Sequence, residues 1–182
     1  YDLKGAQKSF LAGPGLNNVD LIEIAGGRVL VAASDRSDLT KVQLFLALLD
    51  TATGSLAPAG KIVVGPGEGY GICMVKPAGA GGIIAFSAPK EGTIYRTVIT
   101  QGADGTFTGT TTALAQIPTQ VEGCIADPRT GTLYIGEEDA GIWAIDTATG
   151  AKRMIAPIDN KLLVADVEGL AIAPEGTDGG YL

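Results

Sequence analysis

Residues 121–155 read VEGCIADPRTGTLYIGEEDAGIWAIDTATGAKRMI, and this stretch decides the predicted fold. It holds four short apolar runs, which are separated by turns rich in Gly, Asp and Pro. Such turn residues between short apolar runs are typical of antiparallel strands joined by tight connections. The stretch therefore predicts a four-stranded antiparallel unit, with strands over 123–126, 132–135, 141–145 and 152–155.

The same unit recurs along the chain. The DTATG motif of residues 50–54 returns at 146–150, which is 96 residues later, and the VEG motif of 121–123 returns at 167–169, which is 46 residues later. If Tyr70 begins an earlier unit, the step from it to the VEG motif is 52 residues. A repeat of this length suits the four-stranded blade of a β-propeller. The sequence thus predicts an all-β chain of about three blades plus fragments, where a whole ring needs four to eight blades.

The second unit follows the same plan, with strands expected over 72–75, 83–86, 94–99 and 106–112. Residues 39–50 are ambiguous because their apolar positions could also line a helix. Their place in the repeat favours a strand. The remaining segment, PAGAGG at 77–82, is predicted to be a Gly-rich turn, since it lacks the Gly-Lys-Ser/Thr ending of a phosphate-binding loop.

Composition restricts the chemistry that this chain can perform. Among its 182 residues there is no His, which excludes Ser-His-Asp and Cys-His nucleophiles and His-bearing zinc sites. What remains is carboxylate, Lys, Arg and Tyr chemistry, or hard metal ions bound by oxygen. The net charge of -7 argues against nucleic acid as a partner. No apolar run approaches the roughly 18 residues that cross a bilayer, so no membrane partner is expected.

The negative charge is concentrated between residues 122 and 168, where nine acids stand against four bases. If Glu122 and Glu168 are equivalent, both begin innermost strands, with Tyr70 before them, at one end of a central channel. Asp166 lies two residues before Glu168 and points to the same side of a strand. Carboxylates held so close repel one another unless cations bind between them, and Ca²⁺ prefers six to eight oxygen ligands. These positions predict a calcium site, and the alternative is a set of solvated surface acids.

The two cysteines, Cys73 and Cys124, fit no metal-binding spacing. They are either two small buried hydrophobic residues or a pair that joins in an oxidising compartment. The sequence alone leaves both alternatives open.

Both ends of the chain look cut. It opens without an initiator Met or a signal peptide, and it stops at residues 180–182, where a strand is expected to begin. We therefore expect residues 1–182 to be part of a single propeller domain that is truncated at both ends.

Seven segments, taken in order, resemble the motifs of the β-propeller phytases and keep their spacing over nearly the whole chain. The run that ends in Trp143, with its Glu-Glu-Asp, is the most specific of them. A short motif such as Gly-Tyr-Gly occurs by chance, whereas seven motifs in order are specific. The segments are 16–20 (LNNVD), 31–37 (VAASDRS), 68–71 (EGYG), 90–92 (KEG), 121–123 (VEG), 133–143 (LYIGEEDAGIW) and 166–170 (DVEGL).

This resemblance implies a six-bladed propeller enzyme that removes phosphates from phytate, myo-inositol hexakisphosphate. In that family several calcium ions at one end of the channel bridge substrate phosphates and activate a water molecule. The resemblance also implies a secreted or periplasmic protein that is a monomer at full length and whose partner is a small polyanion. The family's amino-terminal motif and its closing blades have no counterpart in these 182 residues.

The resemblance also assigns roles to individual residues. It implies phosphate binding by a cation from each of two segments, a tyrosine beside the activated water, and carboxylates that hold the metal. Two acids next to one of these ligands, Glu137 and Asp139, are expected to shape its loop. The implied phosphate-binding residues are Arg36 and Lys90, the catalytic residues are Tyr70, Glu122 and Glu138, and the calcium ligands are Glu122, Glu138, Asp166 and Glu168.

Two other functions remain open on the sequence. The first is a calcium-dependent propeller hydrolase with a different substrate, such as another phosphomonoester, a lactone or an ester. The second is a non-enzymatic propeller that binds other proteins. Arg36 and Lys90 discriminate among these, because a neutral substrate does not need them, although Arg36 could instead pair with an adjacent acid such as Asp35 or Asp38.

Overall fold

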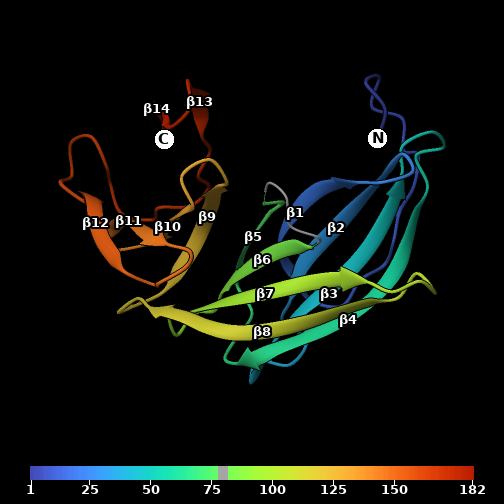
Figure 1. Cartoon of the computed structure of the whole chain (residues 1–182), viewed down its shortest axis with the longest axis horizontal. Helices are drawn as coiled ribbons and strands as arrows, with labels where there is room; N and C mark the ends of the chain where they lie inside the picture. The colour runs from blue at the N-terminus through green and yellow to red at the C-terminus, as the bar shows by residue number, and fades with distance from the viewer. Residues whose placement is uncertain (78–81) are drawn as a thin grey trace.

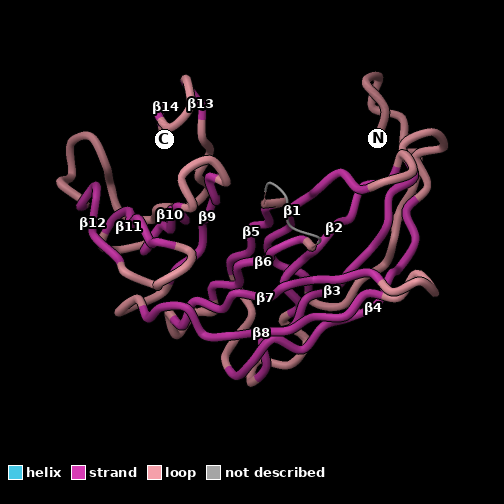
Figure 2. Tube along the Cα trace, in the orientation of Figure 1, coloured by secondary structure: helices cyan, strands magenta, loops and turns pink. Residues whose placement is uncertain are grey.

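The computed structural model describes residues 1–77 and 82–182, so most of the Gly-rich turn predicted at 77–82 lies outside the described residues. All regular secondary structure in the described part is β-strand (Figure 2). Within that part, no helix is long and apolar enough to cross a membrane. The all-β prediction is confirmed.

Twelve of the strands form three antiparallel sheets of four strands each, which follow one another in chain order (Figure 1). A short hairpin of two more strands follows them. The first blade contains β1 (Leu16–Ile24), β2 (Arg28–Asp35), β3 (Lys41–Asp50) and β4 (Leu56–Pro66). The second blade contains β5 (Gly71–Val75), β6 (Ile83–Ala88), β7 (Thr93–Gln101) and β8 (Phe107–Gln116). The third blade contains β9 (Val121–Asp127), β10 (Thr132–Glu137), β11 (Gly141–Asp146) and β12 (Lys152–Pro157), and the hairpin contains β13 (Ala173–Glu175) and β14 (Gly179–Tyr181).

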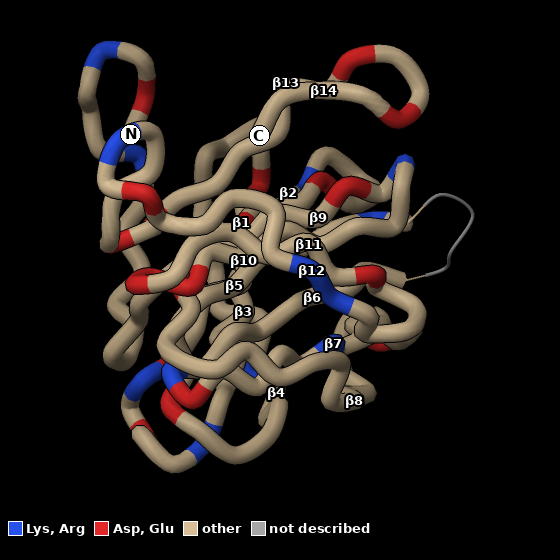
Figure 3. Tube along the Cα trace, turned by 90° about the vertical axis from the view of Figure 1, so that its left-hand side faces the viewer, with Lys and Arg blue, Asp and Glu red and all other residues tan. Residues whose placement is uncertain are grey.

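This arrangement is that of three propeller blades, in which each strand pairs with the next along the chain. The ambiguous segment at 39–50 is strand rather than helix, because β3 pairs along its length with β2 and β4. Charged residues lie mainly on loops and strand ends, whereas the sheets between them carry few charges (Figure 3).

The recurring DTATG motif forms the same turn in the first and third blades. In the first blade, Asp50 Oδ1 accepts the backbone N–H of Thr53 at 2.8 Å and the Thr53 hydroxyl at 2.9 Å. In the third, Asp146 Oδ1 accepts the same two groups of Thr149 at 2.7 and 2.8 Å. Each motif connects the third strand of its blade to the fourth. The sequence repeat therefore reflects a structural repeat, in which an Asp side chain closes a tight turn.

Glycines at or near the start of the innermost strands allow neighbouring blades to pack closely. A Cβ atom at Gly71 would lie 2.0 Å from the carbonyl oxygen of Glu122, and one at Gly123 would lie 1.5 Å from that of Glu168. No side chain fits at such distances, so only glycine lets the next repeat approach here. The two contacts confirm that the regions of Tyr70, Glu122 and Glu168 occupy equivalent places in successive repeats.

Two apolar cores hold the blades together, one on each face of the second blade. Strand β5 supplies both cores, because alternate side chains of a strand point to opposite faces. Ile72 and Met74 belong to the core between the first and second blades. The same core contains Leu30 and Leu44 of the first blade and Ile99 of the second. Cys73 belongs to the core shared with the third blade, where Phe86, Ile94, Leu133 and Ile135 are fully buried.

A disulfide joins the second blade to the third. It links Cys73 of β5 to Cys124 of β9, across 51 residues of chain and with the Cα atoms 5.7 Å apart. Both cysteines are also buried, so the structure combines the two alternatives that the sequence left open. A cross-link of this kind typically stabilises a protein by about 2–4 kcal/mol, mainly by restricting the unfolded chain.

Candidate active site

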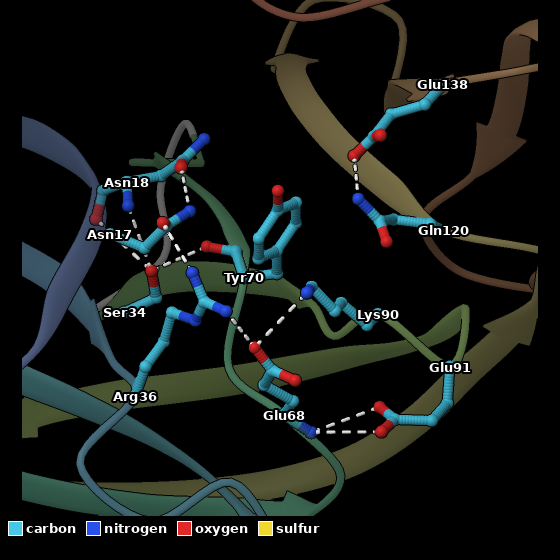
Figure 4. A network of polar contacts seen from close by, with 10 residues as sticks. All are labelled: Asn17, Asn18, Ser34, Arg36, Glu68, Tyr70, Lys90, Glu91, Gln120 and Glu138. Atoms are coloured by element: carbon cyan, nitrogen blue, oxygen red, sulfur yellow. Dashed lines mark hydrogen bonds and ion pairs between the residues drawn. The ribbon is translucent and has the colours of Figure 1, made fainter. Parts of the chain in front are cut away.

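Tyr70 lies directly before β5, where the inner strands of the first two blades meet. Its carbonyl oxygen accepts a hydrogen bond from the Ser34 hydroxyl at 2.5 Å, and Ser34 Oγ accepts the backbone N–H of Asn18 at 3.1 Å. Ser34 is 1% exposed, so this connection is buried. It fixes the backbone of Tyr70 against β1 and β2, and the aromatic ring extends into the space between the blades (Figure 4).

Arg36 and Lys90 come from different blades and meet over the ring of Tyr70. The guanidinium carbon of Arg36 lies 5.1 Å from the ring centroid, and Nζ of Lys90 lies 5.0 Å from it. Both cations also contact the carboxylate of Glu68, Arg36 through Nη2 and Lys90 at 3.4 Å. We call Arg36, Glu68, Lys90 and the ring face that they cover the basic half of the site.

The adjacent acids do not pair with Arg36, contrary to the alternative left open by the sequence. Asp35 is fully buried and binds Nζ of Lys61 at 2.6 Å, and Asp38 binds Lys41 at 3.1 Å. The arginine is therefore directed toward Glu68 and the interior of the site. Burial alone would raise the pKa of Glu68, but the hydrogen bond and charge of Arg36, with a further contribution from Lys90, lower it overall.

The negative charges of Glu122, Glu138 and Glu168 all act on Tyr70, and we call these three residues, with Asp166, the acidic half. Burial raises the pKa of Glu122, and the negative charges of Glu168 and Glu138 raise it further. Burial likewise raises the pKa of the Tyr70 hydroxyl, followed by the charges of Glu122 and Glu138. Glu138 and Glu168 thus influence Glu122 electrostatically.

Asp166 is held beside Glu138 through the backbone. Its N–H donates to the carbonyl oxygen of Glu138 at 2.8 Å, and the N–H of Val167 donates to the same oxygen at 3.2 Å. Asp166 has a φ of 72°, an uncommon left-handed conformation for a residue other than glycine. Glu168 follows in a segment without regular secondary structure, whereas we expected it to begin a strand. The reason is that residues 166–172 find no strand partner among the described residues. They pack instead against Gly123 and Gly136 of the third blade.

The acidic half does not form a closed ligand cage. Among residues 1–77 and 82–182, no group of three or more acidic or Cys side chains is arranged to hold a metal ion. The side-chain amides of Asn18 and Asn17 lie beside Glu122 and partly offset the rise in its pKa. An open cavity of ≈ 340 Å³ runs along the inner strands from these asparagines to Gly123 and Gly169.

Two asparagines connect the halves, a role that their motif alone did not reveal. Asn17 Oδ1 accepts a hydrogen bond from Nη1 of Arg36 at 3.2 Å, and its amide donates to Asn18 Oδ1 at 2.5 Å. Asn18 in turn lies beside Glu122. The start of β1 therefore places neutral amides between the cation of one half and the carboxylate of the other.

Glu137 supports the loop that carries Glu138. Its side chain is 2% exposed, and Oε1 accepts both the backbone N–H and the hydroxyl of Thr119, at 2.9 and 2.6 Å. Oε2 accepts the indole N–H of Trp143 at 2.8 Å. Beside this anchor, Gln120 donates from its amide to Glu138 Oε1 at 2.5 Å and accepts the backbone N–H of Glu138 at 3.0 Å.

The sequence motifs contained more functional residues than we assigned from them. Glu68 lies in the Glu-Gly-Tyr-Gly motif but received no role, although its position two residues before Tyr70 could have indicated a shared side. No motif indicated a role for Gln120, because it lies just outside the Val-Glu-Gly motif of residues 121–123. Glu137 was expected to shape its loop, and its buried hydrogen bonds agree with that expectation.

Successive four-stranded blades, with polar side chains gathered where their inner strands begin, define a chain of β-propeller blades with a candidate site. A family model described as Phytase matches residues 1–182. Over 194 aligned residues the chain is 31% identical to a curated 3-phytase of Bacillus subtilis (strain 168). The alignment covers 100% of this chain and 50% of that relative, so the chain spans about half the relative's length. The chain belongs to the phytase family.

Proposed function

We propose that the protein releases phosphate from phytate, with calcium as its cofactor. The observation that carries this proposal is the meeting of Arg36 and Lys90 over Tyr70, opposite three carboxylates. A polyanionic substrate needs cations to hold it, and an acidic pocket alone would repel it. The named activity of the 31% identical relative supports the same choice.

In this proposal the basic half binds the phosphate groups. The planar fork of Arg36 matches phosphate oxygens in pairs, while Lys90 contributes a flexible point charge. Both cations pack against the ring of Tyr70, which thereby positions them. A tyrosine hydroxyl is protonated at neutral pH, and burial raises its pKa further here, so the hydroxyl can donate a hydrogen bond to a substrate oxygen or to water.

The carboxylates of Glu122, Glu138, Asp166 and Glu168 would hold the calcium. Their chemistry fits this cofactor, because all the donors are oxygens and because burial, followed by the charges of Glu168 and Glu138, raises the pKa of Glu122, so a cation beside it would be favourable. When bound, calcium would neutralise phosphate charge and lower the pKa of a water for attack on phosphorus. The protein's own task is to orient the phosphate, and Glu137 and Gln120 keep Glu138 in place for it.

We further propose that the protein works in an oxidising compartment, as a secreted or periplasmic enzyme. The Cys73–Cys124 disulfide supports this proposal, since such bonds persist mainly outside the reducing cytosol. Measuring free thiols in protein isolated from its native compartment tests it, and two free thiols would contradict it.

A substrate comparison tests the proposed activity against the lactone or ester alternative. We expect phosphate release from phytate and no hydrolysis of a neutral lactone such as gluconolactone. Arg36→Gln should lower phytate turnover, whereas the matched control Arg153→Gln, on an exposed position of β12, should not. Lactone hydrolysis without phosphate release would contradict the proposal.

A further inference from the structure

The basic half of the site contains an anion of its own. Glu68 Oε1 contacts Nη2 of Arg36 and lies 3.4 Å from Nζ of Lys90. Figure 4 shows this carboxylate between the two cations, below the ring of Tyr70. The Glu68 side chain is 16% exposed, against 30% for Arg36 and 33% for Lys90. It therefore occupies the inner position where both cations can reach one anionic group.

The backbone fixes Glu68 at this position. Its N–H donates to the carboxylate of Glu91, at 3.1 Å to Oε2 and 3.3 Å to Oε1, and its carbonyl oxygen accepts the N–H of Lys90 at 3.2 Å. Glu68 is thus held by two consecutive residues of the second blade. These hydrogen bonds hold the backbone and leave the side-chain torsions of Glu68 free, so the carboxylate can rotate away from the cations and return to them.

The guanidinium of Arg36 still has capacity for another acceptor. Nη1 donates to Asn17 and Nη2 to Glu68. Its Nε is buried and has no hydrogen-bond partner among the described residues. A buried donor without a partner is costly, so an additional acceptor near this guanidinium would be stabilising.

We propose that Glu68 is a built-in counter-ion of the anion site, which an incoming phosphate group displaces from Arg36 and Lys90. This proposal rests on the proposed function, which assigns the two cations to phosphate binding. Between turnovers, Glu68 keeps the cations apart and oriented. It also makes the site selective, because a dianionic phosphate can compete for both cations while a singly charged anion competes poorly.

The test measures inorganic phosphate binding to the full-length protein in metal-free buffer, so that neither calcium nor turnover contributes to the signal. The readout is the phosphate dissociation constant, measured by isothermal titration calorimetry. Glu68→Gln keeps the size of the side chain and removes its charge. Glu23→Gln is the matched control, since it removes one charge from an exposed position of β1.

We expect the dissociation constant of Glu68→Gln to fall about three- to fivefold, the effect of removing one partly exposed ion-pair competitor. Glu68→Ala should shift it in the same direction, and Glu23→Gln should match the wild type. An unchanged or higher dissociation constant in both Glu68 variants, or no phosphate binding to them, would overturn the proposal. The phosphate-site assignment fails separately, if Arg36→Gln and Lys90→Gln bind phosphate as the wild type does.

Discussion

The two halves of the site differ in how their charges are balanced. In the basic half, the cations Arg36 and Lys90 share Glu68 as an internal partner, and both pack against the ring of Tyr70. In the acidic half, burial raises the pKa of Glu122, the charges of Glu168 and Glu138 raise it further, and only neutral amides offset this rise. The protein therefore balances one half by itself and leaves the other with an excess of negative charge.

This difference indicates what each half needs from outside. The basic half already has an anion, so a ligand must compete for its place. The acidic half lacks cations, so it gains stability when a cation binds. Within our proposal, calcium completes the acidic half and a phosphate group replaces the internal anion of the basic half.

The largest effect is expected from the acidic half. Glu138→Gln and Glu168→Gln keep side-chain size but remove ligand charge, and each should lower phosphate release from phytate by at least ~100-fold, above the range found for outer-shell partners of metal sites. Glu175→Gln, on an exposed position of β13, is the control. Equal activities for the three variants would show that the carboxylates are misassigned.

The basic half should respond in substrate binding. Arg36→Gln removes a charged hydrogen-bond donor to phosphate, which corresponds to about 1.5–3 kcal/mol, or roughly 10–100-fold in kcat/KM. We expect most of this loss in KM, because the interaction already exists in the bound substrate. Steady-state kinetics with phytate measure it, and an unchanged KM for Arg36→Gln would remove this residue from the phosphate site.

A smaller loss is expected where the acidic half is only supported. Glu137→Gln puts an amide N–H₂ against a donor, either Thr119 or the Trp143 indole, and this mismatch should destabilise the fold by about 1–3 kcal/mol. Because Glu137 supports the loop that carries Glu138, Glu137→Gln should also weaken calcium binding. Adding Trp143→Phe removes the indole donor and should recover part of that lost affinity. Calcium titration of both variants checks this. No recovery in the double variant would mean that Glu137 acts only on stability.

The smallest effect concerns stability and pH. The folded-state pKa of Glu122 is raised, so its favourable contribution is complete below its ordinary pKa and is lost as the pH rises through the folded value. In chelator, Glu122→Gln should therefore raise the Tm at pH 7 by roughly 2–4 °C, equivalent to about 1 kcal/mol for a chain of this size. Melting curves between pH 3 and 8 should show the difference vanishing at the acid end. A constant difference would contradict the charge repulsion.

The sequence predicted the fold better than the site. The DTATG turns and the glycines at 71 and 123 impose local geometry, so their spacing was sufficient to locate the blades. The prediction that Glu122 and Glu168 lie close to Tyr70 came from the same repeat, and the charges of both residues act on Tyr70. The Glu68 contact could not be predicted, because it depends on which of several acids Arg36 selects in three dimensions. The irregular segment around Glu168 also escaped prediction, since strand pairing requires a partner that a local pattern does not reveal.

Chelation tests the central claim that the acidic half is incomplete without a cation. Phosphate release from phytate by the full-length protein would be measured before chelation, after a calcium chelator, and after excess calcium is restored. The account predicts activity that disappears on chelation and returns with calcium, together with a Tm that falls and recovers in parallel. Phosphate release that continues unchanged in the chelator would contradict it.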